Sequence, residues 1–290
     1  MEQIQPLEMQ ESNILKFTHY NFIDKVDETE NEDAVNTFES EKEFRIAISD
    51  GAGAAGIYCR DWAHFLVAQQ PEKPFSKDES NAWFLGISEE FYLQKYKTIN
   101  KSDSFILEKF NTEGSYATVL YVWFNKTNNQ LSYSGIGDTT LFIFRSTQGN
   151  YEPILITPIN EQKSIDDFPK LINWNKSLEY DLASKHIDLL RGDILVLCTD
   201  CLARWLIYNM LVLEQYETQR QLGEDLSKSI DKNILEEFKL RNKYQNLYEL
   251  LKRIKYSMDK GGVILLRELE KKVNEKELDK DDYSLVMKII

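Results

Sequence analysis

The chain lacks the features that mark several classes of protein. It has no apolar run of about 18 residues, so the sequence predicts no membrane-spanning helix and no membrane partner. The N-terminal residues form neither the positive nor the apolar region of a signal peptide. Linkers rich in glycine and serine are missing, as are internal repeats. We therefore expect a cytoplasmic chain that folds as a single domain over residues 1–290, with residues 1–16 loosely attached and residues 207–260 as a helical insertion.

Positive charge is scarce relative to negative charge. The chain has 35 Lys and Arg against 48 Asp and Glu, which gives a formal net charge of −13. Proteins that bind nucleic acids hold the phosphate backbone with clustered Lys and Arg. The charge balance therefore argues against nucleic acid as a partner.

Cysteine is scarce as well. The three cysteines, Cys59, Cys198 and Cys201, are odd in number, which suits a reducing compartment. Cys198 and Cys201 have the CxxC spacing found in half a zinc site or in a redox pair. Because there is no second CxxC and the three histidines are scattered, we favour two packed small side chains over zinc binding or thiol chemistry.

What the sequence does contain is a strand that stops at an acid. Residues 44–49 are mostly apolar, Asp50 follows them, and residues 51–56 are only Gly and Ala. Asp50 can offer a carboxylate and Gly51 an unhindered carbonyl, which are the oxygen ligands that Mg²⁺ and Mn²⁺ prefer. A turn with a solvated aspartate is the alternative.

Four more aspartates stand at the ends of expected elements: Asp33, Asp138, Asp200 and Asp281. Asp200 repeats the pattern of Asp50, because it follows the apolar residues 194–198 and precedes a helical pattern. Asp138 lies beside Gly137, where an ordinary turn aspartate is the alternative. Carboxylates brought together without Lys or Arg repel one another, and divalent cations relieve that repulsion.

Hydrophobic periodicity predicts both helices and strands. The expected helices cover residues 57–70, 81–97 and 263–274, and residues 211–260 are mostly helical. The expected strands cover residues 116–124, 130–136, 140–146, 151–156, 194–198 and 283–290, and we expect the first four to pair as antiparallel hairpins. Five residues form one apolar stripe: Leu240, Tyr244, Leu247, Leu251 and Ile254. We interpret this stripe as packing against the body of the domain, with partner binding as the alternative.

Six motifs follow one another along the chain: Asn31-Glu32-Asp33-Ala34, Ser49-Asp50-Gly51-Ala52-Gly53, Gly114-Ser115-Tyr116-Ala117-Thr118, Gly137-Asp138-Thr139, the run from Gly192 to Asp200, and Asp281-Asp282-Tyr283-Ser284. In content and order they resemble the metal-dependent protein phosphatases of type 2C, and more closely the bacterial branch of that family. The resemblance runs from about Phe17 to the C-terminus.

The resemblance implies a fold and a metal site. The fold is an α+β four-layer α-β-β-α sandwich, with two antiparallel sheets face to face and helices outside. The site holds two Mg²⁺ or Mn²⁺ ions, with Asp50 bridging them and Gly51 contributing its carbonyl. The remaining ligands, direct or through water, are Asp33, Asp200 and Asp281. Asp138 resembles the aspartate associated with a third, more weakly held ion.

The resemblance also implies a reaction. A hydroxide that bridges the two metals hydrolyses phosphoserine or phosphothreonine in a protein substrate of a serine/threonine kinase, and no side chain acts as the nucleophile. The sequence agrees in having no GxSxG turn and no Cys-His pair suited to covalent catalysis.

The chain departs from the family pattern at two positions. Glu28 stands where many members carry an arginine that binds the substrate phosphate, so Lys25 or Arg60 is the candidate for that role. Cys201 stands where glycine is common. An inactive or weakly active phosphatase-like module that binds a phosphoprotein or another partner is the alternative function.

Overall fold

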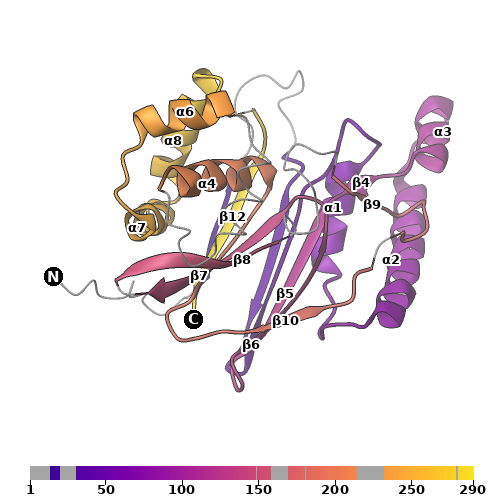
Figure 1. Cartoon of the computed structure of the whole chain (residues 1–290). Coiled ribbons are helices and arrows are strands. Elements are labelled where there is room, and N and C mark those ends of the chain that lie inside the picture. Colours follow the sequence, from indigo (N-terminus) through magenta and orange to yellow (C-terminus); the bar gives the residue numbers. More distant parts are fainter. Residues whose placement is uncertain are drawn as a thin grey trace. The chain divides into compact units, whose positions relative to one another are not determined.

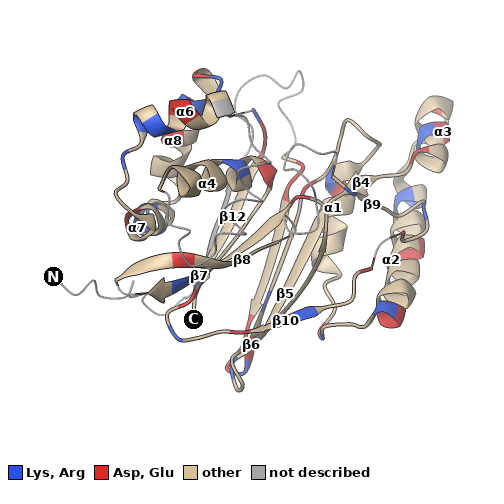
Figure 2. Cartoon of the chain, viewed as in Figure 1, with Lys and Arg blue, Asp and Glu red and all other residues tan. Residues whose placement is uncertain are grey.

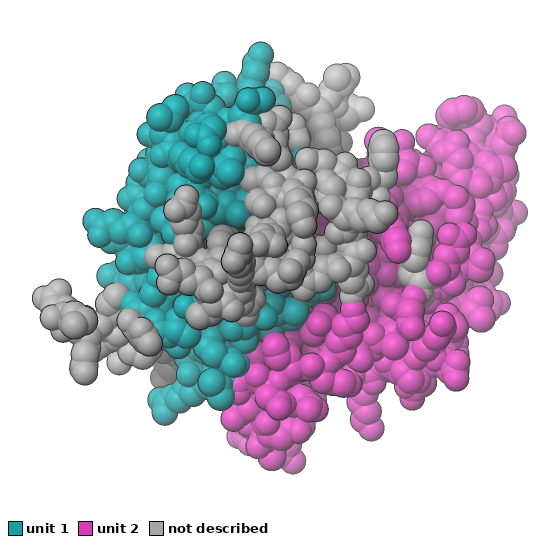
Figure 3. All heavy atoms as spheres, viewed as in Figure 1, with its two compact units in different colours: residues 1–29, 140–168, 190–290 teal, residues 30–139, 169–189 magenta. Residues whose placement is uncertain are grey.

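The chain forms two compact units, each with an antiparallel sheet and its own helices (Figure 1). The structure is a computed structural model that describes residues 14–19, 31–147, 149–157, 169–179, 181–213, 232–278 and 280–290. The first unit contains residues 1–29, 140–168 and 190–290, and the second contains residues 30–139 and 169–189 (Figure 3). A single domain over the whole chain stays a prediction.

The second unit is built on a five-stranded sheet in the order β10-β6-β5-β3-β2, and every neighbouring pair is antiparallel. Its strands are β2 (Ala34–Glu39), β3 (Glu43–Ser49), β5 (Val119–Asn125), β6 (Gln130–Ile136) and β10 (Lys185–Asp188). A separate pair joins β4 (Tyr116–Ala117) to β9 (Ile172–Asn173). The strand predicted before Asp50 is therefore β3, and its last four residues are buried.

Three described helices share the apolar core of this unit: α1 (Cys59–Ala68), α2 (Lys77–Thr98) and α3 (Ser104–Thr112). The rings of Trp62 on α1 and Phe91 on α2 lie 4.9 Å apart in the apolar core. Helix α2 begins four residues before its predicted start because Ser76 and Glu79 form a capping box. Helix α3 was not predicted, although its N-cap Asp103 accepts a hydrogen bond from Ile106 N–H.

The first unit has a second five-stranded antiparallel sheet, in the order β1-β12-β11-β7-β8. Its strands are β1 (Ile14–His19), β7 (Thr140–Thr147), β8 (Asn150–Thr157), β11 (Ile194–Cys198) and β12 (Tyr283–Ile289). Every residue of β11 and β12 is buried. The prediction that residues 194–198 form a strand buried on both faces is confirmed.

Four described helices share the apolar core of the first unit: α4 (Asp200–Val212), α6 (Lys232–Arg241), α7 (Leu247–Asp259) and α8 (Val263–Asn274). The predicted α+β class, with two antiparallel sheets flanked by helices, is confirmed, and the face-to-face stacking of the sheets stays a prediction. No helix in the described part of the chain is long and apolar enough to cross a membrane.

The expected hairpin between residues 130–136 and 140–146 is wrong. Strand β6 pairs with β5 and β10, whereas β7 pairs with β8 and β11. Gly137 has a φ of +104°, and a Cβ atom there would lie 2.5 Å from Thr118 Cγ2. The glycine therefore allows the chain to pass close to Thr118 and then on to the other sheet. A turn motif alone does not distinguish such a crossing from a hairpin.

The prediction of a single apolar stripe over residues 240–254 is also wrong. Helix α6 ends at Arg241 and α7 begins at Leu247, so residues 242–246 interrupt the helical period. Leu240 is 80% exposed, whereas Leu251 is fully buried in the core of the first unit. Packing against the body of the chain is therefore correct for the α7 part of the stripe.

We expect Leu251→Ala to lower the free energy of unfolding by about 2–5 kcal/mol, because it leaves a cavity in a close-packed core. The same substitution at Leu240 removes an exposed side chain and should change the free energy of unfolding by less than about 0.5 kcal/mol. Urea denaturation of both variants and the unmodified chain measures the difference. Equal losses of stability would contradict the exposure of Leu240.

Candidate metal centre

Asp33 and Asp50 occupy facing positions at one end of the sheet in the second unit. Strands β2 and β3 are antiparallel with Ala34 opposite Ser49, and the next step of the same register places Asp33 opposite Asp50. Facing residues of antiparallel strands have Cβ atoms about 5 Å apart. Asp33 is only 4% exposed. Two carboxylates are thus close together where one of them is withdrawn from water.

Thr118, which directly precedes β5, is hydrogen-bonded to Asp50. The Asp50 N–H donates to Thr118 Oγ1 at 2.9 Å, and the Thr118 N–H donates to the Asp50 carbonyl at 2.8 Å. Thr118 Oγ1 also lies 2.5 Å from Thr139 Oγ1, and both threonines are buried. This hydroxyl pair links the backbone at Asp50 to the residue that follows Asp138. The sequence places Thr118 in a motif but does not show its role, because that role depends on strand register.

The turn after Asp50 is fixed by Glu32 and by the first turn of α1. Gly51 N–H donates to the Glu32 carbonyl at 3.2 Å, and Gly53 N–H donates to Glu32 Oε2 at 3.1 Å. A Cβ atom on Gly51 would lie 2.9 Å from the carbonyl carbon and oxygen of Cys59. Only glycine fits this approach, which brings the backbone N of Arg60 beside the turn as well.

Cys59 is a packed thiol. Burial raises the pKa of Cys59 to about 11, and its Sγ accepts a hydrogen bond from Tyr116 N–H at 3.4 Å. The thiol is therefore neutral at physiological pH and unsuited to attack as a thiolate. This agrees with a structural role for Cys59 beside the Gly51 turn.

The first unit gathers Asp200, Cys201 and Asp281. One ligand atom from each of the three lies within 4.8 Å of the others, and Cys201 Sγ is 4.0 Å from Asp281 Oδ2. Strand pairing brings them together, because the contacts of β11 with β12 continue through Thr199 N–H to the Ser284 carbonyl at 3.1 Å. In the sequence, Cys201 forms a CxxC pair with Cys198 and departs from the family pattern, and the structure places its sulfur among the acids.

Positive charge near this cluster comes from Arg204 and from the start of α4. Arg204 Nη2 lies 3.6 Å from Asp200 Oδ2, and Asp200 stands in the first turn of the helix, where the helix dipole favours an anion. Burial chiefly, and then the proximity of Cys201, Asp281 and Asp200, raise the pKa of Tyr283. The phenol of Tyr283 is therefore neutral at physiological pH.

The donor atoms of both units suit a divalent cation. Carboxylate and carbonyl oxygens are hard ligands for Mg²⁺ and Mn²⁺, while the sulfur of Cys201 is a softer donor than Mg²⁺ prefers. The Gly51 carbonyl accepts from Gly53 N–H at 3.0 Å and retains a second lone pair. Asp33, Asp50, Gly51 and Asp138 belong to the second unit, and Asp200 and Asp281 belong to the first. Glu28 and Lys25 lie outside the described residues.

The chain is similar to solved structures of bacterial serine/threonine phosphatases, at low sequence identity. The enzyme of Staphylococcus aureus has 13% identity and a TM-score of 0.49, over 98% of this chain and 99% of that one. The Mycobacterium tuberculosis enzyme PstP has 15% identity and a TM-score of 0.45, over 96% and 97%. RsbX, solved in complex with magnesium, has 13% identity and a TM-score of 0.41, over 99% and 100%. No family model and no curated protein matches the chain.

We expect Thr118→Val to lower the free energy of unfolding by about 1–3 kcal/mol, because the partly buried Asp50 N–H loses its hydroxyl acceptor while the shape is preserved. Thr118→Ser keeps the hydroxyl and is the matched control. Chemical denaturation monitored by tryptophan fluorescence measures both variants. A valine variant as stable as the serine variant would show that the hydroxyl bridge contributes nothing.

Proposed function

We propose that the chain is a metal-dependent phosphatase that hydrolyses phosphoserine and phosphothreonine in proteins. The observation that carries the proposal is the facing pair Asp33 and Asp50 at one sheet end, followed by the close turn that only glycine at position 51 allows. This arrangement suits cation binding, and it coincides with two of the six motifs that resemble the type 2C phosphatases.

The proposed metal ligands are those that the resemblance implies. Asp50, Asp33 and the Gly51 carbonyl, together with Asp200 and Asp281, would hold two Mg²⁺ or Mn²⁺ ions, and Asp138 would serve a third, more weakly held ion. When bound, such ions activate water as the nucleophile and stabilise the charge on the phosphoryl oxygens. The grouping of Asp200 and Asp281 within one cluster supports this assignment.

The residues of the chain orient the reaction in this proposal. Thr118 fixes the backbone of Asp50 through two hydrogen bonds and so limits the directions open to its carboxylate. Arg60 lies in the first turn of α1 beside Gly51, and we assign it the role of binding the substrate phosphate. A guanidinium is suited to this because its planar donors match phosphate oxygens in pairs.

The proposed partner is a phosphorylated protein produced by a serine/threonine kinase, because such kinases make the phosphate esters that this reaction removes. We also propose a cytoplasmic location. The three cysteines support it, since all of them are buried free thiols, as is usual in a reducing compartment.

Hydrolysis of an aryl phosphate and of a phosphothreonine peptide should require added Mn²⁺ or Mg²⁺ and stop with chelator. Asp50→Asn should lower kcat by about 100-fold or more, because it removes a charged ligand, and even residues that only orient ligands change activity by roughly 10–100-fold. Asp78→Asn makes the same chemical change on the exposed start of α2 and should leave the rate unaltered.

An Asp50→Asn variant with the unmodified rate would contradict the proposed metal chemistry. A folded chain without any turnover, with or without metal, would instead favour the phosphatase-like binding module.

A further inference from the structure

The turn that follows α8 carries an ion pair where an apolar contact is usual. Lys276 N–H donates to the Val273 carbonyl and Glu277 N–H donates to the Lys272 carbonyl, both at 2.9 Å, which is the Schellman pattern of a helix end. Lys276 has a φ of +59°, a left-handed conformation that glycine normally supplies. The two positions that commonly make an apolar contact in this motif are occupied by Glu277 and Lys272, whose side chains form an ion pair instead.

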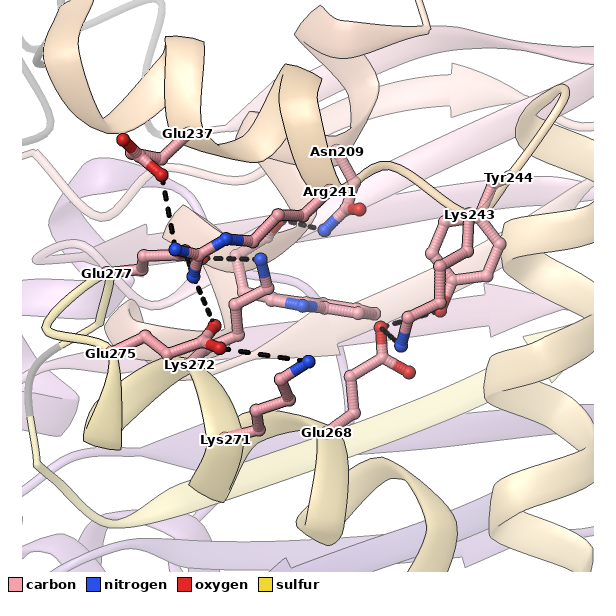
Figure 4. Close-up of polar contacts among 11 residues, drawn as sticks. Asn209, Glu237, Arg241, Lys243, Tyr244, Glu268, Lys271, Lys272, Glu275 and Glu277 are labelled. Carbon is pink, nitrogen blue, oxygen red and sulfur yellow. Dashed lines mark hydrogen bonds and ion pairs between the residues drawn. The ribbon is translucent and has the colours of Figure 1, made fainter.

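Glu277 is the centre of a group of charged residues that includes Arg241 of α6 (Figure 4). Only 5% of Glu277 is exposed, and its carboxylate binds both Lys272 and Arg241. Arg241 also contacts Glu275 at 2.5 Å and Glu237 at 3.3 Å. We call these five residues the Glu277 cluster. A buried carboxylate without such partners is strongly unfavourable, so Glu277 depends on α6 as well as on α8.

This region is not suited to binding an anion. The pocket beside the cluster has a volume of about 30 Å³, which is room for water rather than for a substrate. The surrounding positive side chains are matched by acids (Figure 4): Arg241, Lys243, Lys271 and Lys272 stand against Glu237, Glu268, Glu275 and Glu277. The polar contacts therefore join protein segments to one another.

Helix α6 contacts both segments that lead to the Asp200 and Asp281 cluster. Its Phe238 ring lies 4.9 Å from the ring of Tyr208 on α4, the helix that begins at Asp200. The ammonium of Lys272 lies 4.1 Å from the Phe238 ring centroid, which connects α6 to the end of α8. Asp281 follows Glu277 by four residues, and four residues of chain span at most about 14 Å.

We propose that Arg241 is a positioning residue for Asp281. By binding Glu277 it stabilises the left-handed turn at Lys276, which is unfavourable for a residue with a Cβ atom, and so directs the chain toward β12. This gives the helical segment after α4 a role in the first unit's metal cluster. The role of Asp281 as a metal ligand rests on the proposed function, whereas the control of the turn by Arg241 does not.

Arg241→Met, compared with Lys239→Met, tests this proposal. Lys239 lies on the same helix and pairs with the exposed Glu236, so its substitution is a matched loss of one positive charge. In Arg241→Met, but not in Lys239→Met, we expect faster amide hydrogen exchange over residues 276–283 and a Kd for Mn²⁺ about tenfold higher. Unchanged exchange in Arg241→Met, or equal changes in both variants, would overturn the proposal.

A second variant separates positioning from general loss of stability. Lys276→Gly removes the unfavourable left-handed side chain, so we expect it to reduce the effect of Arg241→Met on exchange and on Mn²⁺ affinity. An undiminished effect would overturn the proposal. If Arg241→Met does not fold, Arg241→Lys takes its place. We expect a smaller change in the same direction, and the absence of any change would count against the proposal.

The two proposals fail in different ways. A wild-type chain that binds no Mn²⁺ contradicts the proposed function, and hydrogen exchange still decides whether Arg241 controls the turn.

Discussion

Repulsion between carboxylates at the end of a sheet is the constraint on which the site depends. Antiparallel pairing places Asp33 across from Asp50, and one of these acids is almost completely withdrawn from water. Like charges in such surroundings repel one another, and a bound cation relieves that repulsion. Lys and Arg alternate with Asp and Glu along the helices (Figure 2), and the pairing of Asp33 with Asp50 comes from strand register.

Both units solve the problem of orienting acids with backbone and hydroxyl contacts. In the second unit, Thr118 accepts the Asp50 N–H and contacts Thr139, while glycine allows α1 to approach the turn. In the first unit, the end of β11 lies beside the start of β12, which brings Asp200 near Asp281. Asp50, Asp200 and Asp281 therefore stand at the ends of largely buried strands, and Asp33 stands at the end of the edge strand β2.

Much of the fold follows from local sequence patterns. Strands β6, β11 and β12 and helix α8 lie where the periodicity predicts them, because each is a single apolar pattern bounded by turn residues. The hairpins of β5 with β6 and of β7 with β8 are confirmed as well. The lack of pairing between β6 and β7 could not be predicted, since a glycine turn is compatible both with a hairpin and with a crossing between sheets. Leu240 was misassigned because helical spacing continues numerically across residues 242–246, where the helix itself is interrupted.

The candidate acids could be found from the sequence because they flank apolar strands. Their supporting contacts could not be found in this way, since 68 positions separate Thr118 from Asp50, 21 separate Glu32 from Gly53 and 36 separate Arg241 from Glu277. Such contacts depend on register and helix packing, which no single stretch of sequence specifies. The proximity of Cys201 to Asp281 has the same origin, because 80 positions separate the two residues.

The most direct test of the account is the anomalous scattering of a crystal grown with excess Mn²⁺. The account predicts manganese peaks with the Asp50 carboxylate and the Gly51 carbonyl among their ligands, and with Asp200 and Asp281 also coordinated. Manganese bound only elsewhere, or no manganese at these residues despite saturating metal, would contradict it.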